Sequence, residues 1–290
     1  MTPHKIITGT GLSVMPESEY EVFGQTHIGK KRRVNQDTFL LDSGTGLFLV
    51  ADGMGGHKAG DTASVLAAEE IARNFENAFR KMEDFPPDQP YDKNLSAVAN
   101  ALKIALKKAN RRVWDKGASA DEFHGMGTTL SAVCLGEKRL TCANVGDSPI
   151  FLIQSGRVFP LSISHTVEQE AGILENPEGI QLARQYPGML TRAIGGDETV
   201  EPHICEIPVC RGDSFVLCTD GLSKTVDKNE IAEIVQKFSA KEACSELIDL
   251  SNERGGVDNI TVVVVKIEKR KIHFRLKRML PFQRLLKTDK

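Results

Sequence analysis

The feature that most constrains this chain of 290 residues is an aspartate placed beside an apolar, strand-like run. Residues 47–50 form such a run, and Ala51-Asp52-Gly53 follows it directly. A buried carboxylate costs several kcal/mol unless a cation or a positive side chain neutralises it. On its own, an Asp-Gly pair after a strand is most often a plain turn. The pattern becomes informative only when it is repeated.

The same arrangement recurs along the chain. Aspartates beside other strand-like runs are Asp37, Asp147, Asp220 and Asp258. One interpretation is that each is a separate turn residue. The other is that the fold gathers them, in which case they would repel one another unless cations lay between them. Oxygen ligands without a His or Cys cluster favour hard ions, so the second interpretation predicts Mg²⁺ or Mn²⁺.

Two such ions about 4 Å apart lower the pKa of a bridging water and favour in-line displacement at phosphorus. Arg32 stands five residues before Asp37, where its guanidinium could bind phosphate oxygens in a bidentate manner. His57 follows the Gly-rich turn after Asp52 and is a candidate acid for the leaving oxygen. The residues alone therefore predict metal-assisted phosphate chemistry.

Composition narrows the class of protein. The net charge is −2, so no global field favours nucleic acid or a membrane surface. The six cysteines form no CxxC pair, which favours small core residues in a reducing cytosol over a disulfide framework or zinc site. No apolar run reaches the roughly 18 residues of a spanning helix, and the start lacks a signal-peptide pattern. We expect a cytoplasmic protein.

Hydrophobic periodicity predicts helices over 63–79 and 95–113, joined by a Pro-rich loop at 82–94, and a second helix pair over 231–248. Residues 19–29 begin irregularly, and 162–201 read as a surface segment with one short helix at 166–174. Strands are predicted at 38–41, 47–50, 128–135, 139–145, 150–153, 158–161, 213–218 and 260–265. Paired helices among runs of strands indicate an α+β fold, with antiparallel sheets and helices on their outer faces.

Seven short motifs occur in an order that resembles the metal-dependent Ser/Thr protein phosphatases (PPM, type 2C) in their bacterial form. They are Arg32-x-x-Asn35-Gln36-Asp37, Ala51-Asp52-Gly53-Met54-Gly55-Gly56-His57, Gly127-Thr128-Thr129, Ala143-Asn144-Val145-Gly146-Asp147-Ser148, Leu190-Thr191-Arg192-Ala193-Ile194-Gly195, Thr219-Asp220-Gly221-Leu222 and Asp258-Asn259-Ile260-Thr261. The resemblance implies a four-layer α-β-β-α sandwich, with two central antiparallel sheets flanked by helix pairs. It divides the chain into an N-terminal extension (1–18), a phosphatase domain (19–267) with a flap at about 162–201, and a basic C-terminal tail (268–290).

The resemblance also implies roles for individual residues. Two Mn²⁺ or Mg²⁺ ions are expected, with Asp52 bridging them and the Gly53 carbonyl on one. The remaining roles are Asp37, Asp220 and Asp258 as further metal ligands, Asp147 with Asp220 at a third, looser ion, Arg32 on the phosphate and His57 as general acid. The chain departs from the family pattern at Pro149, where Arg is usual, and at Ser164, where Asp is common.

The activity implied is hydrolysis of phosphoserine and phosphothreonine in proteins, by a monomer that reverses a bacterial Ser/Thr kinase. Phosphorylated proteins are the expected partners, including the kinase and its substrates, and no nucleic acid is expected. Two alternatives stay open at this point. One is a catalytically silent regulator that binds phosphoproteins, and the other is a phosphomonoesterase for small molecules.

The segment 268–290 carries nine Lys or Arg residues interleaved with apolar ones. A semi-ordered basic terminus or a helix packed on the domain would explain this composition. The alternative is a surface anchor that makes weak contact with an acidic membrane or an acidic partner.

Overall fold

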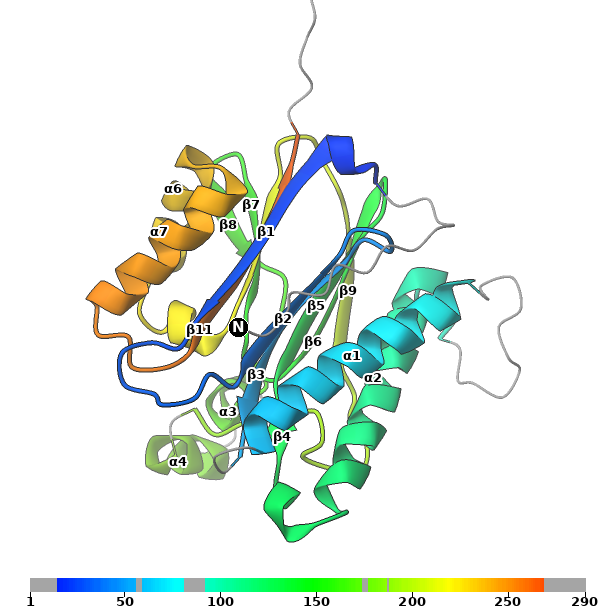
Figure 1. Ribbon diagram of the computed structural model, residues 1–290, viewed down its shortest axis with the longest axis vertical. Coiled ribbons are helices and arrows are strands. Elements are labelled where there is room, and N and C mark those ends of the chain that lie inside the picture. The colour runs from blue at the N-terminus through cyan, green and yellow to red at the C-terminus, as the bar shows by residue number, and fades with distance from the viewer. Residues whose placement is uncertain (1–14, 56–58, 81–91, 174–176, 187, 269–290) are drawn as a thin grey trace, which may run out of the picture.

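The computed structural model describes residues 15–55, 59–80, 92–173, 177–186 and 188–268. Two antiparallel sheets pack face to face in the middle of the molecule (Figure 1). The first sheet has the order β1 (Tyr20–His27), β11 (Ile260–Ile267), β10 (Ser214–Cys218), β7 (Ile150–Gln154), β8 (Arg157–Pro160). The second has the order β2 (Asp37–Asp42), β3 (Leu47–Met54), β5 (Leu130–Leu135), β6 (Arg139–Val145), β9 (His203–Pro208), with β4 (Gly127–Thr128) paired to β3.

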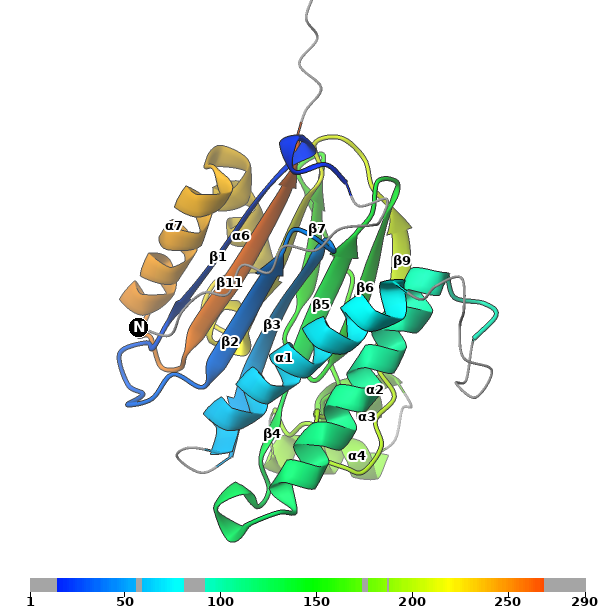
Figure 2. The same cartoon turned by 45° about the vertical axis from the view of Figure 1, so that its right-hand side comes forward.

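Helices cover both outer faces of this sandwich (Figure 2). On the second sheet lie α1 (Ala59–Arg80) and α2 (Ala97–Gly117), and on the first lie α6 (Lys228–Lys237) and α7 (Ala240–Glu253). Shorter elements are α3 (Val167–Ile173), α4 (Pro177–Gln185), α5 (Asp220–Ser223), η1 (Glu17–Glu19) and η3 (Asp121–Phe123). The four-layer α-β-β-α sandwich and its α+β class are confirmed.

The alternation of side chains along β3 shows how one strand serves two cores. Leu47 and Leu49 face α1 and α2, whereas Phe48 and Val50 face the other sheet. Successive strand residues point to opposite faces, so both sets are buried when helices cover one face and a second sheet covers the other. Strand β11 is buried in the same way, which its run of β-branched residues suits.

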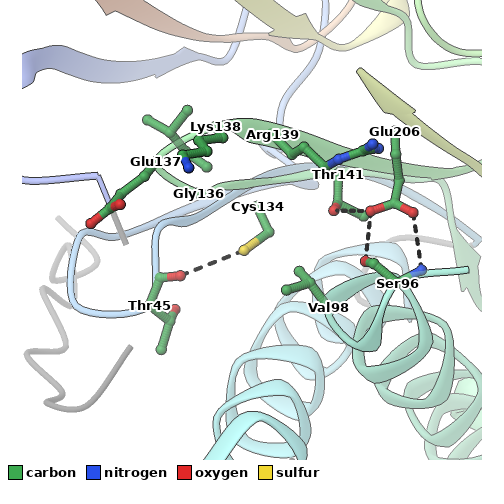
Figure 3. A pocket seen from close by; sticks show the side chains of 11 residues that line it. Thr45, Ser96, Val98, Cys134, Gly136, Glu137, Lys138, Arg139, Thr141 and Glu206 are labelled. Carbon is green, nitrogen blue, oxygen red and sulfur yellow. Dashed lines mark hydrogen bonds between the residues drawn. The ribbon is translucent and has the colours of Figure 1, made fainter. Parts of the chain in front are cut away.

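Helix ends are fixed by side-chain caps. Asp227 with Glu230, and Ser239 with Glu242, form capping boxes at the starts of α6 and α7. Ser96 caps α2 and is itself held by Glu206 of β9, whose carboxylate accepts hydrogen bonds from the Ser96 hydroxyl (2.6 Å) and N–H (3.1 Å), as Figure 3 shows. This contact ties the helical layer to the edge of the second sheet.

Two predictions about where strands begin or end were wrong. Residues 19–29, expected to begin irregularly, form β1, which pairs with β11 over eight residues from Tyr20 to His27. The hydrophobic pattern of β1 is weak because most of its side chains are only half-buried. Pairing with β11 is what holds it in a strand conformation. The glycines after Ala51 were expected to end the preceding strand, but β3 continues through Gly53 to Met54, where β4 pairs with it.

Other differences concern short elements. The strand expected at 128–135 is divided into β4 and β5, the edge strand β9 was not predicted, and the segment 162–201 contains α4 as well as α3. Most of the loop predicted at 82–94 lies outside the described residues, as does the basic tail after Glu268. Among the helices that the structure describes, none combines the length and the apolar character needed to cross a membrane.

The layer between the sheets should dominate stability. Phe215 is fully buried there, whereas Phe159 on β8 is 42% exposed. We expect Phe215→Ala to lower the free energy of unfolding by roughly 3–5 kcal/mol, because it removes a buried ring and leaves a cavity. Phe159→Ala, the matched control, should cost less than about 1 kcal/mol. Urea denaturation measures both, and equal losses would contradict this assignment of the core.

Candidate active site

Five aspartates meet where the two sheets end. Asp37 opens β2 and faces Asp52 of β3 as its cross-strand partner. The other three come from connections: Asp147 follows β6, Asp220 opens α5 directly after β10, and Asp258 precedes β11. Burial, followed by the charges of the other four aspartates, raises the pKa of Asp52 well above its usual value. The structure therefore brings together all five carboxylates that the sequence singled out.

Asp37 is 7% exposed and only partly satisfied. Its Oδ2 accepts hydrogen bonds from the hydroxyls of Thr219 (2.9 Å) and Thr261 (2.7 Å). Its Oδ1 is buried and has no hydrogen-bond partner among the described residues. Burial raises the pKa of Asp37 to about 7, against the opposing effect of the two threonines. A buried oxygen without a donor is a position for a ligand outside the chain.

The backbone around Asp52 is fixed by β4 and the residue after it. The Asp52 N–H donates to the Thr129 hydroxyl (3.0 Å), and the Asp52 carbonyl accepts from the N–H of Thr129 (2.9 Å) and the hydroxyl of Thr128 (2.9 Å). The Thr129 hydroxyl also bonds to that of Ser148 (2.7 Å), the residue after Asp147. Asp52 and Asp147 are thus held by one connected network.

Two cationic side chains border the acidic group. The Arg32 guanidinium donates to Asp258 Oδ2 (2.8 Å), and this hydrogen bond, together with the nearby carboxylates, raises the pKa of Arg32. The Lys224 ammonium donates to Asp220 Oδ2. Asp220 Oδ1 is buried and has no partner in the part of the chain that the structure describes. Each cation thus contacts one carboxylate of the group directly.

Asn259 positions the loop that carries Arg32. Its side chain accepts from the Gln36 N–H (2.9 Å) and donates to the carbonyls of Ile28 (2.9 Å) and Val34 (3.0 Å). These three bonds span the loop between β1 and β2. Since Asn259 directly follows Asp258, the same dipeptide supplies a carboxylate and fixes the chain around the arginine.

Two glycines allow the acidic segments to approach one another. A Cβ at Gly221 would lie 1.9 Å from the Asn259 carbonyl oxygen, and one at Gly53 would lie 2.1 Å from the Gly60 carbonyl oxygen. Neither gap accepts a side chain. Gly221 therefore lets α5 bring Asp220 beside the start of β11, and Gly53 lets β3 end against the first turn of α1.

The segment expected to be a flap is anchored beside Asp147. The ring Nδ1 of His165 accepts a hydrogen bond from the backbone N–H of Gly146 (3.1 Å). The backbone N–H of His165 donates to the carbonyl of Gly146 (3.0 Å). Burial and then the Arg192 charge lower the pKa of His165 to about 4, so the ring is neutral at pH 7. Helices α3 and α4 follow this anchor and lie at the same end of the sandwich as β4 (Figures 1 and 2).

The residues present fit hard divalent cations. The donor set is entirely oxygen, two buried carboxylate oxygens lack donors, and the pKa values of Asp37, Asp52 and Asp147 are raised by burial. A cation would remove this cost by compensating the ionised forms. Among the described residues, no three His, Cys, Asp or Glu side chains lie close enough together in this conformation to hold one ion.

A surface pocket of about 420 Å³ lies elsewhere (Figure 3). It is lined by residues such as Thr45, Cys134 and Glu206, at the end of the second sheet opposite Asp52. The Glu206 carboxylate is occupied by bonds to Ser96 and Thr141. This pocket contains no member of the acidic group.

Sequence reasoning placed the carboxylates but missed their supports. Gly53 was predicted as a carbonyl ligand and lies buried in β3, whereas the predicted acid His57 is outside the described residues. The residues missed are Thr129, Thr219, Lys224, Asn259 and Thr261. Thr219, Lys224, Asn259 and Thr261 lie within four residues of Asp220 or Asp258 in the sequence. Their closeness to a predicted metal ligand could therefore have identified them.

Comparison with known proteins agrees with this geometry. The model of the family "Protein phosphatase 2C" matches residues 23–255. The chain belongs to the protein phosphatase 2C family. It is 36% identical over 253 residues to a Streptococcus pyogenes protein named as 2C-type, covering 84% of this chain and 96% of that one. The resemblance found from the motifs is thereby confirmed.

Two further relatives have more specific names. The serine/threonine phosphatase stp of Listeria monocytogenes is 30% identical over 249 residues, covering 83% of this chain and 94% of its own. Among solved structures, the catalytic domain of the phosphatase PstP, in complex with two manganese ions, superposes with a TM-score of 0.69 at 29% identity. That match covers 87% of this chain and 99% of the PstP chain.

The buried carboxylate of Asp37 should destabilise the metal-free protein at neutral pH. The folded chain keeps its proton up to about pH 7, whereas the unfolded chain releases it near 3.8, so stability falls as pH rises between these values. We expect Asp37→Asn in EDTA at pH 8 to raise the free energy of unfolding by about 2–4 kcal/mol.

Asp42, at the other end of β2, provides the matched control for Asp37. It is also buried, but its oxygens accept from the Gly44 N–H (3.0 Å) and the Thr45 hydroxyl (2.6 Å). Asp42→Asn should therefore destabilise the protein under the same conditions. Urea denaturation at pH 5 and pH 8 separates the two effects. An Asp37→Asn protein no more stable than wild type at pH 8 would contradict the account.

Proposed function

We propose that this 2C-type protein phosphatase hydrolyses phosphoserine and phosphothreonine in proteins at a dinuclear Mn²⁺ or Mg²⁺ site formed by its buried aspartates. The observation that carries the proposal is the convergence of five carboxylates with two unsatisfied buried oxygens. In this assignment the ions would be held by the carboxylates of Asp37, Asp52, Asp220 and Asp258 and by the Gly53 carbonyl. The manganese named for PstP supports the choice of ion.

Metal ions bound here would supply a water of lowered pKa as the nucleophile. The chain's own residues then have separate tasks. Arg32 exchanges its bond to Asp258 for the phosphate oxygens, which a guanidinium can bind in a bidentate manner. Thr219 and Thr261 keep Oδ2 of Asp37 in place and direct Oδ1 away from them. His57 is proposed to protonate the leaving oxygen of the serine or threonine.

A protein substrate suits the surface better than a small phosphomonoester. The segment 162–201, proposed as the flap, exposes large apolar side chains on and near α4: Ile180, Leu182, Tyr186 and Met189. Because this segment is anchored at Gly146, beside Asp147, its exposed apolar groups favour contact with a polypeptide around the phosphorylated residue. A silent regulator is disfavoured because every proposed metal carboxylate is present.

Partners and setting complete the proposal. Phosphorylated proteins imply a Ser/Thr kinase whose action this enzyme reverses, and we propose that the chain acts as a monomer. A cytoplasmic location is proposed because its six cysteines are free thiols, which a reducing compartment preserves. The same proposal divides the chain into an N-terminal extension (1–18), a phosphatase domain (19–267) and a basic tail (268–290). It also includes contact of that tail with an acidic membrane or an acidic partner.

The direct test is phosphate release from a phosphothreonine peptide with Mn²⁺, Mg²⁺ or EDTA. We expect release with either metal and none in EDTA, and a loss of at least about 100-fold in Asp52→Asn, because a proposed metal ligand at the centre of the acidic group is removed. A panel of small phosphomonoesters, run in parallel, should give lower kcat/KM. Release in EDTA would contradict the metal site, and binding of the phosphopeptide without release would favour the silent regulator.

Arg32 should contribute mainly through the phosphate. We expect Arg32→Ala to lower kcat/KM for the phosphopeptide by roughly 10- to 1,000-fold, since a charge-assisted bidentate contact is lost. Arg33→Ala is the matched control, because Arg33 is an exposed arginine in the same loop. It should stay within about twofold of wild type. Equal losses in the two variants would indicate general attraction by the loop instead of a specific phosphate contact.

A further inference from the structure

Lys224 is the second cation at the acidic site, and the proposed reaction assigns it no task. Its position is set by the backbone: the Lys224 N–H donates to the Asp220 carbonyl (2.9 Å) at the end of α5. Residues four apart on a helical turn lie on the same face, so its side chain runs beside that of Asp220. The ammonium donates to Asp220 Oδ2.

The Lys224 charge reaches more than one carboxylate. The carboxylate that the ammonium contacts is Asp220; this hydrogen bond raises the pKa of Lys224, and the charges of Asp147 and Asp258 contribute further. Asp147 is the notable partner, because its environment contains the negative charge of Asp220 and the positive charge of Lys224. Arg32, by contrast, interacts with Asp258, Asp52 and Asp220. Both cations thus interact with Asp220 and Asp258, and Lys224 differs from Arg32 in interacting with Asp147 as well.

We propose that the Lys224 ammonium is the built-in counter-ion of the Asp147 and Asp220 pair, and that it takes the place of a third divalent ion there. The inference rests on the proposed dinuclear site and adds a limit to it, namely that the chain binds two ions. It also revises the third-ion role expected for Asp147 from the sequence.

The charges support this limit. When all five aspartates are ionised, they carry five negative charges. Two divalent cations and one ammonium balance them, which leaves Arg32 free for a phosphate dianion. A third divalent ion beside Lys224 would place an excess of positive charge against one pair of carboxylates, at a cost that burial of Asp147 increases.

The test counts bound Mn²⁺ by isothermal titration calorimetry and by electron paramagnetic resonance of the free ion. Wild type should bind two Mn²⁺ per chain, and this count needs no variant.

Lys224→Met keeps the apolar stem and removes the charge, so it should gain a third, weaker site. Lys224→Arg keeps the charge and should bind two. Lys228→Met, at an exposed lysine on α6, is the control for a general loss of positive charge and should also bind two.

The outcomes separate this inference from the function on which it rests. Three Mn²⁺ bound to wild type, or two bound to Lys224→Met, would overturn the role of Lys224 and leave the dinuclear site intact. A wild type that binds no Mn²⁺ would overturn both. A third site in Lys228→Met as well as in Lys224→Met would show that net charge alone sets the number of ions.

Discussion

Mutual repulsion among five buried or half-buried aspartates is the constraint on which the rest of this structure depends. Both sheets contribute to the group, because Asp37 and Asp52 lie on paired strands of one sheet while Asp220 and Asp258 adjoin neighbouring strands of the other. The sandwich thus brings the charges together. The free energy gained by burying its core holds them there against their mutual repulsion. Such a site stores a cost that cations relieve, so binding of metal and stability of the fold are coupled.

The acidic group was predictable because its signal is local. Each aspartate adjoins an apolar run, and strands end where a sheet ends, so repetition of the pattern already indicated convergence. The ordered motifs then specified the family and the four-layer sandwich. The long helices α1 and α2 were equally accessible, since their apolar stripes recur over many turns.

What the sequence did not reveal depends on contacts between distant segments. Strand β1 is ordered by β11, which lies more than 230 residues further along the chain, and β9 is a half-buried edge strand with little pattern of its own. The bonds from Thr219 and Thr261 to Asp37, and the position of Lys224, likewise depend on how separate strands meet. These features depend on tertiary contacts, which a short stretch of sequence does not contain.

The most direct test of the central claim is an anomalous difference map, recorded at the manganese edge from crystals grown with Mn²⁺. The account predicts two strong peaks, both within liganding distance of the Asp52 carboxylate, with Asp37, Asp220 and Asp258 around them. Peaks located only at other acidic residues, or none near Asp52 in crystals of active enzyme, would contradict it. The aspartates would then be gathered for a reason other than holding the catalytic ions.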